Sequence, residues 1–270
     1  MIAPETQPQA SSTRIPRVIH YCWFGGRPLP DFAQRCLDSW REALPEYRIQ
    51  RWDESNWDVS RHPYSARAYA LKRYAFVSDL CRLDVLAKHG GIYLDTDVVV
   101  FKSFDPLLSY SAFLGMMYSD SIGTAVMAST KDSELITSIL ARYDSLLLGD
   151  HPNNDVVTRH LVESYPSFVL GNHNQSLPGG IAIFDRWHFE RFSSQTGRSY
   201  AQHLVANSWH DTPSRKIGPL AHPESGPGIL TATLRERVGN LRTIPKAAMF
   251  RTYVSHKLRF KRAVPLEQTR

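Results

Sequence analysis

The first hundred residues alternate between short apolar runs and amphipathic stretches, and this alternation constrains the fold more than any other feature of the chain. Residues 15–24, 47–52 and 92–101 are rich in β-branched and aromatic side chains and are predicted to be strands. Residues 31–44 and 64–89 place apolar side chains three and four positions apart, which predicts helices. A strand–helix–strand–helix–strand order predicts an α/β fold with a parallel, doubly wound sheet. Such sheets bind ligands beyond the carboxyl ends of their strands.

The pattern is looser after residue 105. Residues 112–115 and 122–128 could be strands, and residues 131–148 could be a helix. Residues 149–200 are rich in Pro, Gly, Asn and Ser and are predicted to be mostly loops.

The chain is expected to hold one domain. We place this domain at residues 15–225, after a disordered leader (residues 1–14) and before a basic segment (residues 226–270). The first residues are polar and lack the apolar core of a secretory signal. The sequence has no run of eighteen apolar residues, so no membrane span is predicted. The three cysteines lie in apolar segments and are interpreted as reduced core residues. A cytoplasmic location is therefore expected.

Charge is unevenly distributed along the chain. The net charge is +6, but the last forty residues hold ten basic and two acidic side chains and so carry +8. This segment predicts peripheral contact with an anionic membrane, or else a solvated tail. No recognition motif accompanies the charge, so nucleic acid is not an expected partner.

Two aspartates interrupt the apolar segment HGGIYLDTDVVVF, at positions 95 and 97. Among sixteen aspartates an Asp-x-Asp arises about once by chance, so the pair alone could be a solvated strand end. On a strand, Tyr93, Asp95 and Asp97 would share one side. Two carboxylates on one side repel unless a cation lies between them, and aspartate oxygens suit Mg²⁺ or Mn²⁺. This spacing favours a metal site.

Two charged residues precede this segment on the helix predicted over 64–89. Asp79 and Arg82 are three positions apart and are therefore neighbours, either as a surface ion pair or as part of a site. The Gly90-Gly91 turn can bring this helix back to the aspartates. Arg82 could then meet a phosphate, and Asp79 could accept a ribose hydroxyl.

Further candidates lie at two distant positions. Trp23, directly before Gly25-Gly26, is predicted to stack on a ligand, whereas its neighbours Tyr21 and Phe24 are predicted to be core residues. In the segment YAQHLVANSWH, His203 is a candidate third metal ligand, and Ser208 and Trp209 are candidates for a ligand edge.

Three blocks of sequence, residues 15–26, 74–100 and 200–209, together resemble the family-32 glycosyltransferases with a DXD motif. These bacterial and fungal enzymes are related to the fungal initiating α-1,6-mannosyltransferase and, distantly, to the glucosyltransferase domains of large clostridial toxins. The resemblance implies a GT-A fold with a mixed sheet and flanking helices. It also implies a UDP- or GDP-sugar donor, a divalent cation (Mn²⁺ or Mg²⁺) and hexose transfer with retention, as in surface (capsular) polysaccharide synthesis. A glycan or a lipid-linked molecule would be the acceptor.

The resemblance also implies roles for individual residues. Trp23 falls where the base stacks, Asp79 and Arg82 where the ribose, donor sugar or phosphates are held, and Tyr93 near ribose and phosphate. Asp95 matches the aspartate that touches donor sugar and ribose, and Asp97 matches the direct metal ligand. His203, Ser208 and Trp209 match the C-terminal metal and phosphate block. Outside these blocks, Asn153, Asn154 and Asp155 are only candidates for contacting the donor sugar.

Two alternatives remain at the level of sequence. In a Mg²⁺-dependent phosphohydrolase of the haloacid dehalogenase type, Asp95 would be a nucleophile, because YLDTDV fits the nucleophile motif of that class. That reading leaves Trp23, Asp79 and Arg82 without a role. In a non-catalytic module that binds nucleotide sugars or glycans, the two aspartates would have no chemical task.

Overall fold

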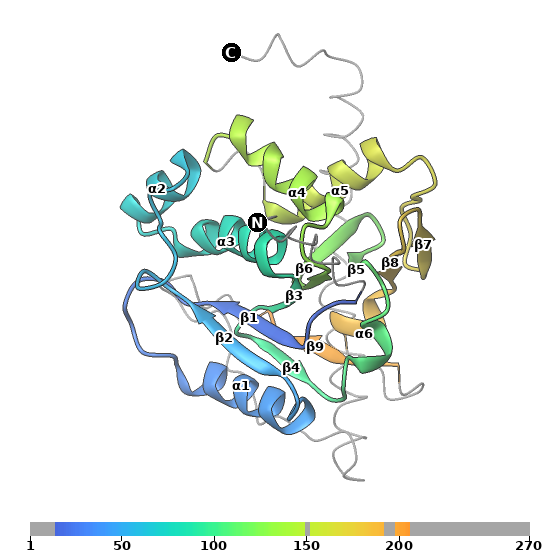
Figure 1. Cartoon of the computed structure of the whole chain (residues 1–270), viewed down its shortest axis with the longest axis horizontal. Coiled ribbons are helices and arrows are strands. Elements are labelled where there is room, and N and C mark those ends of the chain that lie inside the picture. Colours follow the sequence, from blue (N-terminus) through green and yellow to red (C-terminus); the bar gives the residue numbers. More distant parts are fainter. Residues whose placement is uncertain (1–13, 149–151, 192–197, 206–270) are drawn as a thin grey trace, which may run out of the picture.

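The computed structural model describes residues 14–148, 152–191 and 198–205, and its centre is a seven-stranded sheet (Figure 1). The strand order is β2-β1-β3-β6-β5-β8-β7, and β4 pairs with β9 in a second sheet of two strands. The strands of the large sheet are β1 Val18–Cys22, β2 Arg48–Trp52, β3 Gly91–Leu94, β5 Ala112–Tyr118, β6 Ser121–Ser129, β7 Gln175–Leu177 and β8 Ile181–Phe184. Those of the small sheet are β4 Val98–Val100 and β9 Ala201–His203.

The large sheet is parallel on one side and mixed as a whole. β1 runs parallel to both β2 and β3, as the strand–helix alternation predicts. β6 is antiparallel to its neighbours β3 and β5, and β5 is parallel to β8. The mixed α/β architecture expected for a GT-A glycosyltransferase is confirmed.

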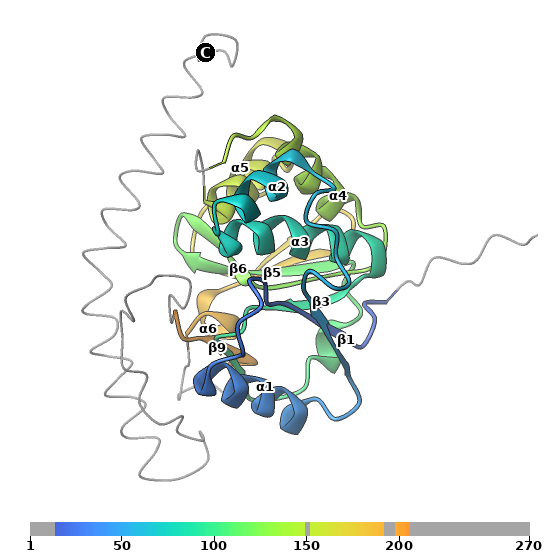
Figure 2. The ribbon, with the colours of Figure 1, turned by 90° about the vertical axis from the view of Figure 1, so that its left-hand side faces the viewer.

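Helices cover both faces of the sheet (Figure 2). On one side lie α2 Pro63–Ala70, α3 Tyr74–His89, α4 Glu134–Ala141 and α5 Asn153–Ser164. On the other side lie α1 Asp31–Ala43, the short α6 Arg186–Phe189 and the small sheet. Two 3₁₀ turns, at Asp105–Leu107 and Arg142–Ser145, complete the described elements.

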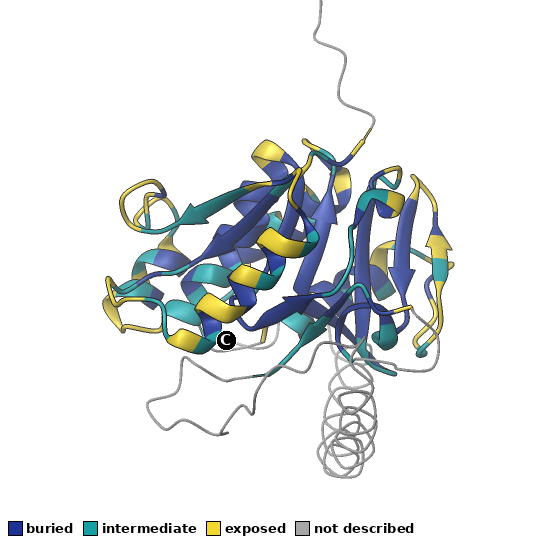
Figure 3. Ribbon diagram, turned by 90° about the horizontal axis from the view of Figure 1, so that it is seen from below, coloured by how far each residue is buried: buried dark blue, intermediate teal, exposed yellow. Residues whose placement is uncertain are grey.

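Each face of the sheet has its own hydrophobic core. Tyr93 packs with the α3 side, while its neighbours Ile92 and Leu94 pack with the α1 side, as alternation along a strand requires. The central strands β1, β3, β5, β6 and β8 are buried along most of their length, whereas exposed residues lie mainly on outer helix faces and loops (Figure 3).

The prediction of one helix over residues 64–89 is wrong, because a turn divides it into α2 and α3. Lys72 has a φ of 56°, the left-handed conformation that commonly ends a helix. The Arg73 N–H donates to Ala68 O, and the Lys72 N–H donates to Tyr69 O, which is the Schellman pattern. Glycine usually occupies the position of Lys72, so the sequence did not reveal the break.

The prediction of one strand over residues 92–101 is also wrong. β3 ends at Leu94, and β4 begins at Val98 in the other sheet. The Val98 N–H donates to Asp95 O at 3.0 Å and closes a tight turn. Asp95 and Asp97 therefore lie on a turn at the carboxyl end of β3, and not within a strand. We call this side of the large sheet, where β1 and β3 end, the sheet edge.

The segment 149–200 contains more regular structure than its composition predicts. α5 buries Val156, Val157 and Leu161 against the α3-side core, and β7, β8 and α6 follow it. The prediction of mostly loops is therefore wrong. The helix expected over 131–148 is shorter, because α4 ends at Ala141 in a 3₁₀ turn.

Cys22, Cys36 and Cys81 are buried and unpaired, as expected for core residues. None of the helices in the described ranges is both long and apolar enough to span a bilayer. The basic C-terminal segment and residues 1–13 of the leader lie outside the described residues.

Candidate active site

The turn between β3 and β4 carries the two aspartates, and backbone hydrogen bonds fix both of them. The Asp95 N–H donates to Ala125 O of β6 at 2.9 Å, and the Leu204 N–H donates to Asp97 O at 2.9 Å. The Asp97 side chain is 11% exposed, whereas that of Asp95 is 27% exposed. The pair thus lies at a partly open edge of the sheet, where several strands end.

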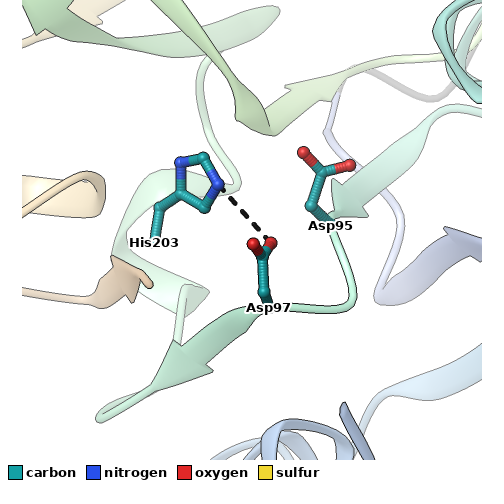
Figure 4. Close-up of side chains that lie close together, drawn as sticks. All are labelled: Asp95, Asp97 and His203. Carbon is teal, nitrogen blue, oxygen red and sulfur yellow. Dashed lines mark ion pairs between the residues drawn. The ribbon is translucent and has the colours of Figure 1, made fainter. Parts of the chain in front are cut away.

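Pairing of β9 with β4 brings His203 beside Asp97. Val98 lies opposite His203 in the antiparallel register, and His203 Nε2 is 3.4 Å from Asp97 Oδ1. Asp95, Asp97 and His203 each offer a ligand atom, and these atoms lie within 4.8 Å of one another (Figure 4). The structure thus brings together the three residues predicted to bind the metal.

Arg82 of α3 connects the helix to the same turn. Its NH2 lies 3.0 Å from Asp79 Oδ1 and 3.2 Å from Asp95 Oδ1. Its NH1 donates to Thr124 O at 2.7 Å, its Nε donates to Ser78 O at 3.3 Å, and the guanidinium lies over the Tyr93 ring. These contacts use most of the five guanidinium N–H groups, so Arg82 is held rigidly between two carboxylates.

Tyr93 and Arg82 share one oxygen of Asp95. The Tyr93 hydroxyl donates to Asp95 Oδ1 at 2.8 Å. Burial raises the pKa of Asp95 and the Asp97 carboxylate raises it further, whereas Arg82 lowers it. Because Oδ1 already accepts from two groups, Oδ2 is the oxygen of Asp95 best placed for a cation.

Asp79 joins the site through Arg82 and through the start of α5. Burial raises the pKa of Asp79 to about 6, against the opposing effects of Arg82 and of the nearby Asn153 amide. The Tyr143 hydroxyl donates to Asn153 Oδ1 at 2.9 Å and orients that amide. The structure therefore brings Asn153 next to Asp79, whereas the Asn154 amide donates to Ile122 O of β6.

Glu190, which follows α6, is a site residue that the sequence did not indicate. Its Oε2 lies 2.9 Å from His203 Nδ1, and its side chain is only 4% exposed. Burial alone would lower the pKa of His203, but Asp97 and Glu190 on its two sides raise it well above its usual range. Glu190 lies in a segment predicted to be a loop, and no spacing connects it to the aspartates.

Trp23 leaves the sheet at the same edge as Asp95. The register of β1 with β3 pairs His20 with Tyr93, so the residues after β1 and β3 emerge side by side. Trp23 is half-buried, and its indole N–H donates to Arg27 O at 2.6 Å. Ser208 and Trp209 lie outside the described residues, so their predicted roles stay predictions.

The donor atoms at the turn fit a hard divalent cation. Two carboxylates converge there with an imidazole nitrogen, and carboxylates are the ligand type that suits Mn²⁺ and Mg²⁺. Asp79, Asp95 and Asp97 bring three carboxylates to a region where Arg82 supplies one permanent positive charge.

Residues 30–114 match the sequence profile of a family described as "Glycosyltransferase sugar-binding region containing DXD motif". The matched stretch includes Asp79, Arg82, Asp95 and Asp97, and it ends before His203. Over residues 30–114 this match agrees with the class predicted from the sequence, the glycosyltransferases with a DXD motif.

Two named fungal proteins are similar in sequence. Inositol phosphoceramide mannosyltransferase 3 of Schizosaccharomyces pombe is 29% identical over 218 residues, which is 78% of this chain and 60% of that protein. Glucan organizing enzyme 1 of Cryptococcus neoformans var. grubii is 31% identical over 126 residues, which is 43% of this chain and 33% of that protein. The chain thus spans less than two thirds of the length of either relative.

Solved structures similar to this chain include two described as glycosyltransferases. The PaToxG glycosyltransferase superposes with a TM-score of 0.47 at 21% identity, covering 57% of this chain and 70% of that one. The galactosyltransferase LgtC superposes with a TM-score of 0.40 at 11% identity, covering 80% of this chain and 95% of that one. Both TM-scores are below 0.5.

Proposed function

We propose that this protein is a metal-dependent glycosyltransferase that transfers a hexose from a UDP- or GDP-sugar. The observation that carries the proposal is the convergence of Asp95, Asp97 and His203 within 4.8 Å at the sheet edge. These residues would hold Mn²⁺ or Mg²⁺, which, when bound, neutralises the nucleoside diphosphate that leaves. The family match over residues 30–114 supports sugar transfer as the reaction class.

The surrounding residues have separate tasks in this proposal. Arg82 holds Asp95 through its Oδ1 and adds fixed positive charge beside the diphosphate. Tyr93 donates to the same oxygen, so the carboxylate cannot rotate away from the cation. Asp79 would accept a ribose hydroxyl, and Asn153, held by Tyr143, lies next to it and would contact the donor sugar.

Donor recognition would extend beyond this cluster. Trp23 would stack on the base, since it emerges at the same sheet edge. Ser208 and Trp209 would contact the phosphates, a role that rests on the resemblance of the block 200–209 alone.

We extend the proposal to transfer with retention, which rests on the family resemblance. Arg82 and Tyr93 bind Asp95 Oδ1, and His203 lies against Asp97 Oδ1. Neither aspartate is thus placed as a free nucleophile for a double displacement. A same-face substitution through an oxocarbenium-like state is therefore favoured. The bonds from Arg82 and Tyr93 to Asp95 also argue against the phosphohydrolase alternative, because that alternative needs Asp95 as its nucleophile.

The acceptor is proposed to be a glycan or a lipid-linked molecule in surface polysaccharide synthesis. The name of the Schizosaccharomyces pombe relative, a mannosyltransferase acting on inositol phosphoceramide, supports an acceptor with a lipid part. The basic last forty residues would hold the protein at the inner face of the cytoplasmic membrane, close to such an acceptor.

A panel of UDP- and GDP-sugars tests the proposal. We expect one donor to release its nucleoside diphosphate in the presence of Mn²⁺, EDTA to stop the release, and added Mn²⁺ to restore it. Proton NMR of the product gives the anomeric configuration and so tests retention. Release that is indifferent to EDTA would contradict the metal-dependent reaction, and binding of a donor without any release would favour the non-catalytic alternative.

A further inference from the structure

We propose that Glu190 is a positioning residue of the cation site, which holds the His203 ring so that Nε2 faces Asp97 and the cation. The inference rests on the proposed function, because it assumes that His203 is a ligand. It adds a residue from outside the matched region to the site.

The two ring nitrogens of His203 have different partners. Nδ1 lies 2.9 Å from Glu190 Oε2, and Nε2 lies 3.4 Å from Asp97 Oδ1. Because a carboxylate accepts from Nδ1–H, Nε2 is the nitrogen that can give up its proton and offer its lone pair to a metal. The geometry thus assigns the hydrogen-bonding nitrogen and the metal-binding nitrogen of this histidine.

The backbone around Glu190 is tied to the strand that carries His203. The Glu190 N–H donates to Arg186 O at 3.0 Å within the α6 turn, and the Tyr200 N–H donates to His188 O at 2.8 Å. Because α6 and the start of β9 are joined in this way, Glu190 and His203 keep their relative position.

Gly123 of β6 provides the space for the Glu190 carboxylate. A Cβ at this position would overlap Glu190 Oε1. The φ of Gly123 is not in the left-handed region, so the backbone conformation does not require glycine there. The glycine in this buried strand is therefore explained by the carboxylate beside it. A buried carboxylate is costly, and its bond to His203 offsets part of that cost.

The test measures Mn²⁺ binding by the full-length protein without donor, using the EPR signal of free Mn²⁺. We expect Glu190→Ala to raise the Kd for Mn²⁺ by about 10- to 100-fold, the usual effect of losing a hydrogen-bonding partner of a metal ligand. Glu190→Gln should lie between Glu190→Ala and the wild type, because its amide oxygen can still accept from Nδ1–H. Glu163→Gln, on the exposed side of α5, is the matched control and should bind as the wild type does.

A second measurement does not depend on whether a Glu190 variant folds. In the wild-type protein with Mg²⁺, long-range ¹H–¹⁵N NMR should show the proton of His203 on Nδ1, with the signal assigned by its loss in His203→Ala. A proton on Nε2 would overturn the inference.

Two results separate this inference from the proposed function. If His203→Ala weakens Mn²⁺ binding but Glu190→Ala stays within twofold of the wild type, the inference about Glu190 fails alone. If neither variant changes Mn²⁺ binding, the cation site fails with it.

Gly123→Ala should lower the melting temperature less when combined with Glu190→Ala than in the wild type, since the added methyl then fills vacated space. Equal losses in the two backgrounds would contradict the packing argument.

Discussion

At the scale of single residues, the two aspartates of the turn differ in what already binds them. Arg82 and Tyr93 bind Oδ1 of Asp95, whereas Asp97 faces His203 at 3.4 Å. Asp95 would therefore keep partial orientation without a cation, and Asp97 matches the direct metal ligand of the family that the sequence resembles. Asp97 is the residue whose loss should most affect metal binding.

Asp97→Asn should reduce metal-dependent turnover by at least about 100-fold, which is roughly 2.7 kcal/mol of activation free energy. The substitution removes one charge from a site for a hard cation and keeps the shape of the side chain. Steady-state release of nucleoside diphosphate with Mn²⁺ measures the effect. Asp38→Asn, at an exposed pair with Arg41 on α1, is the control. Near-normal activity of the folded Asp97 variant would show that Asp97 is not a ligand.

Trp23→Ala should weaken donor binding by about 1–3 kcal/mol, the contribution of one base stacked on an aromatic ring. Calorimetry with the nucleoside diphosphate gives this loss, and the melting temperature gives the cost to folding. A large fall in melting temperature with unchanged nucleotide affinity would identify Trp23 as a core residue instead.

At the residue level, the sequence predicted which side chains lie together where chemistry and local spacing coincided. Asp79 and Arg82 are helix neighbours, and Asp95 and Asp97 share a motif, so their association was visible in the chain. Glu190 meets His203 only because α6 packs beside β9, and the sequence contains no local sign of that contact.

At the scale of elements, two glycines and one buried histidine hold the start of β3, at the opposite end of the strand from the aspartates. Gly90 and Gly91 have φ values of 63° and 106°, and a Cβ on either would press on a neighbouring backbone. His20 of β1 is fully buried, and its Nε2 lies 2.8 Å from Gly90 O, while its Nδ1 accepts from the Trp52 indole at 3.0 Å. This histidine connects β1, β2 and the start of β3.

The buried His20 should make stability fall in acid. Burial lowers its pKa from 6.5 to about 4, so below about 6.5 the unfolded chain binds a proton that the folded protein does not. Between those values stability decreases as the pH falls, by on the order of 2 to 3 kcal/mol from this group by pH 4.5. Urea unfolding at pH 7 and pH 4.5 should show a smaller difference for His20→Gln than for the wild type. The exposed His173→Gln is the control, and an unchanged pH dependence in His20→Gln would contradict the assignment.

Elements were predictable from the sequence where periodicity alone determines them. The strands and helices up to α3 follow their apolar patterns. The break at Lys72 depends on a left-handed residue that is not glycine, and the division of residues 92–101 depends on which sheet each half joins. α5 was not predicted because Asn, Asp and Pro at its start resemble loop composition, although its later turns pack on the core.

At the scale of the whole molecule, the positive charge of the chain is concentrated in its C-terminal segment. The last forty residues carry +8, and the other 230 residues sum to −2. Aromatic and aliphatic residues are interleaved with the basic ones, at Phe250, Tyr253, Leu258 and Phe260. A surface of anionic lipid would attract this segment and leave the sheet-edge site to the acceptor.

Flotation with liposomes containing phosphatidylserine tests this contact. Each engaged Lys or Arg contributes about 1 kcal/mol, so binding should be clear at low salt and lost at about 0.5 M salt. Deletion of residues 245–270 should abolish it. Equal binding by the truncated protein, or no binding by the intact one, would refute membrane attachment and favour a solvated tail.

The central claim is that Asp95, Asp97 and His203 together hold a divalent cation. Anomalous diffraction from a crystal grown with Mn²⁺ and a nucleoside diphosphate, recorded above and below the manganese edge, tests it most directly. We expect one strong manganese peak within bonding distance of Asp97 and His203 Nε2, with Asp95 on its other side and the diphosphate attached. A peak bound elsewhere, or a nucleotide bound at the sheet edge without manganese between these three residues, would contradict the account.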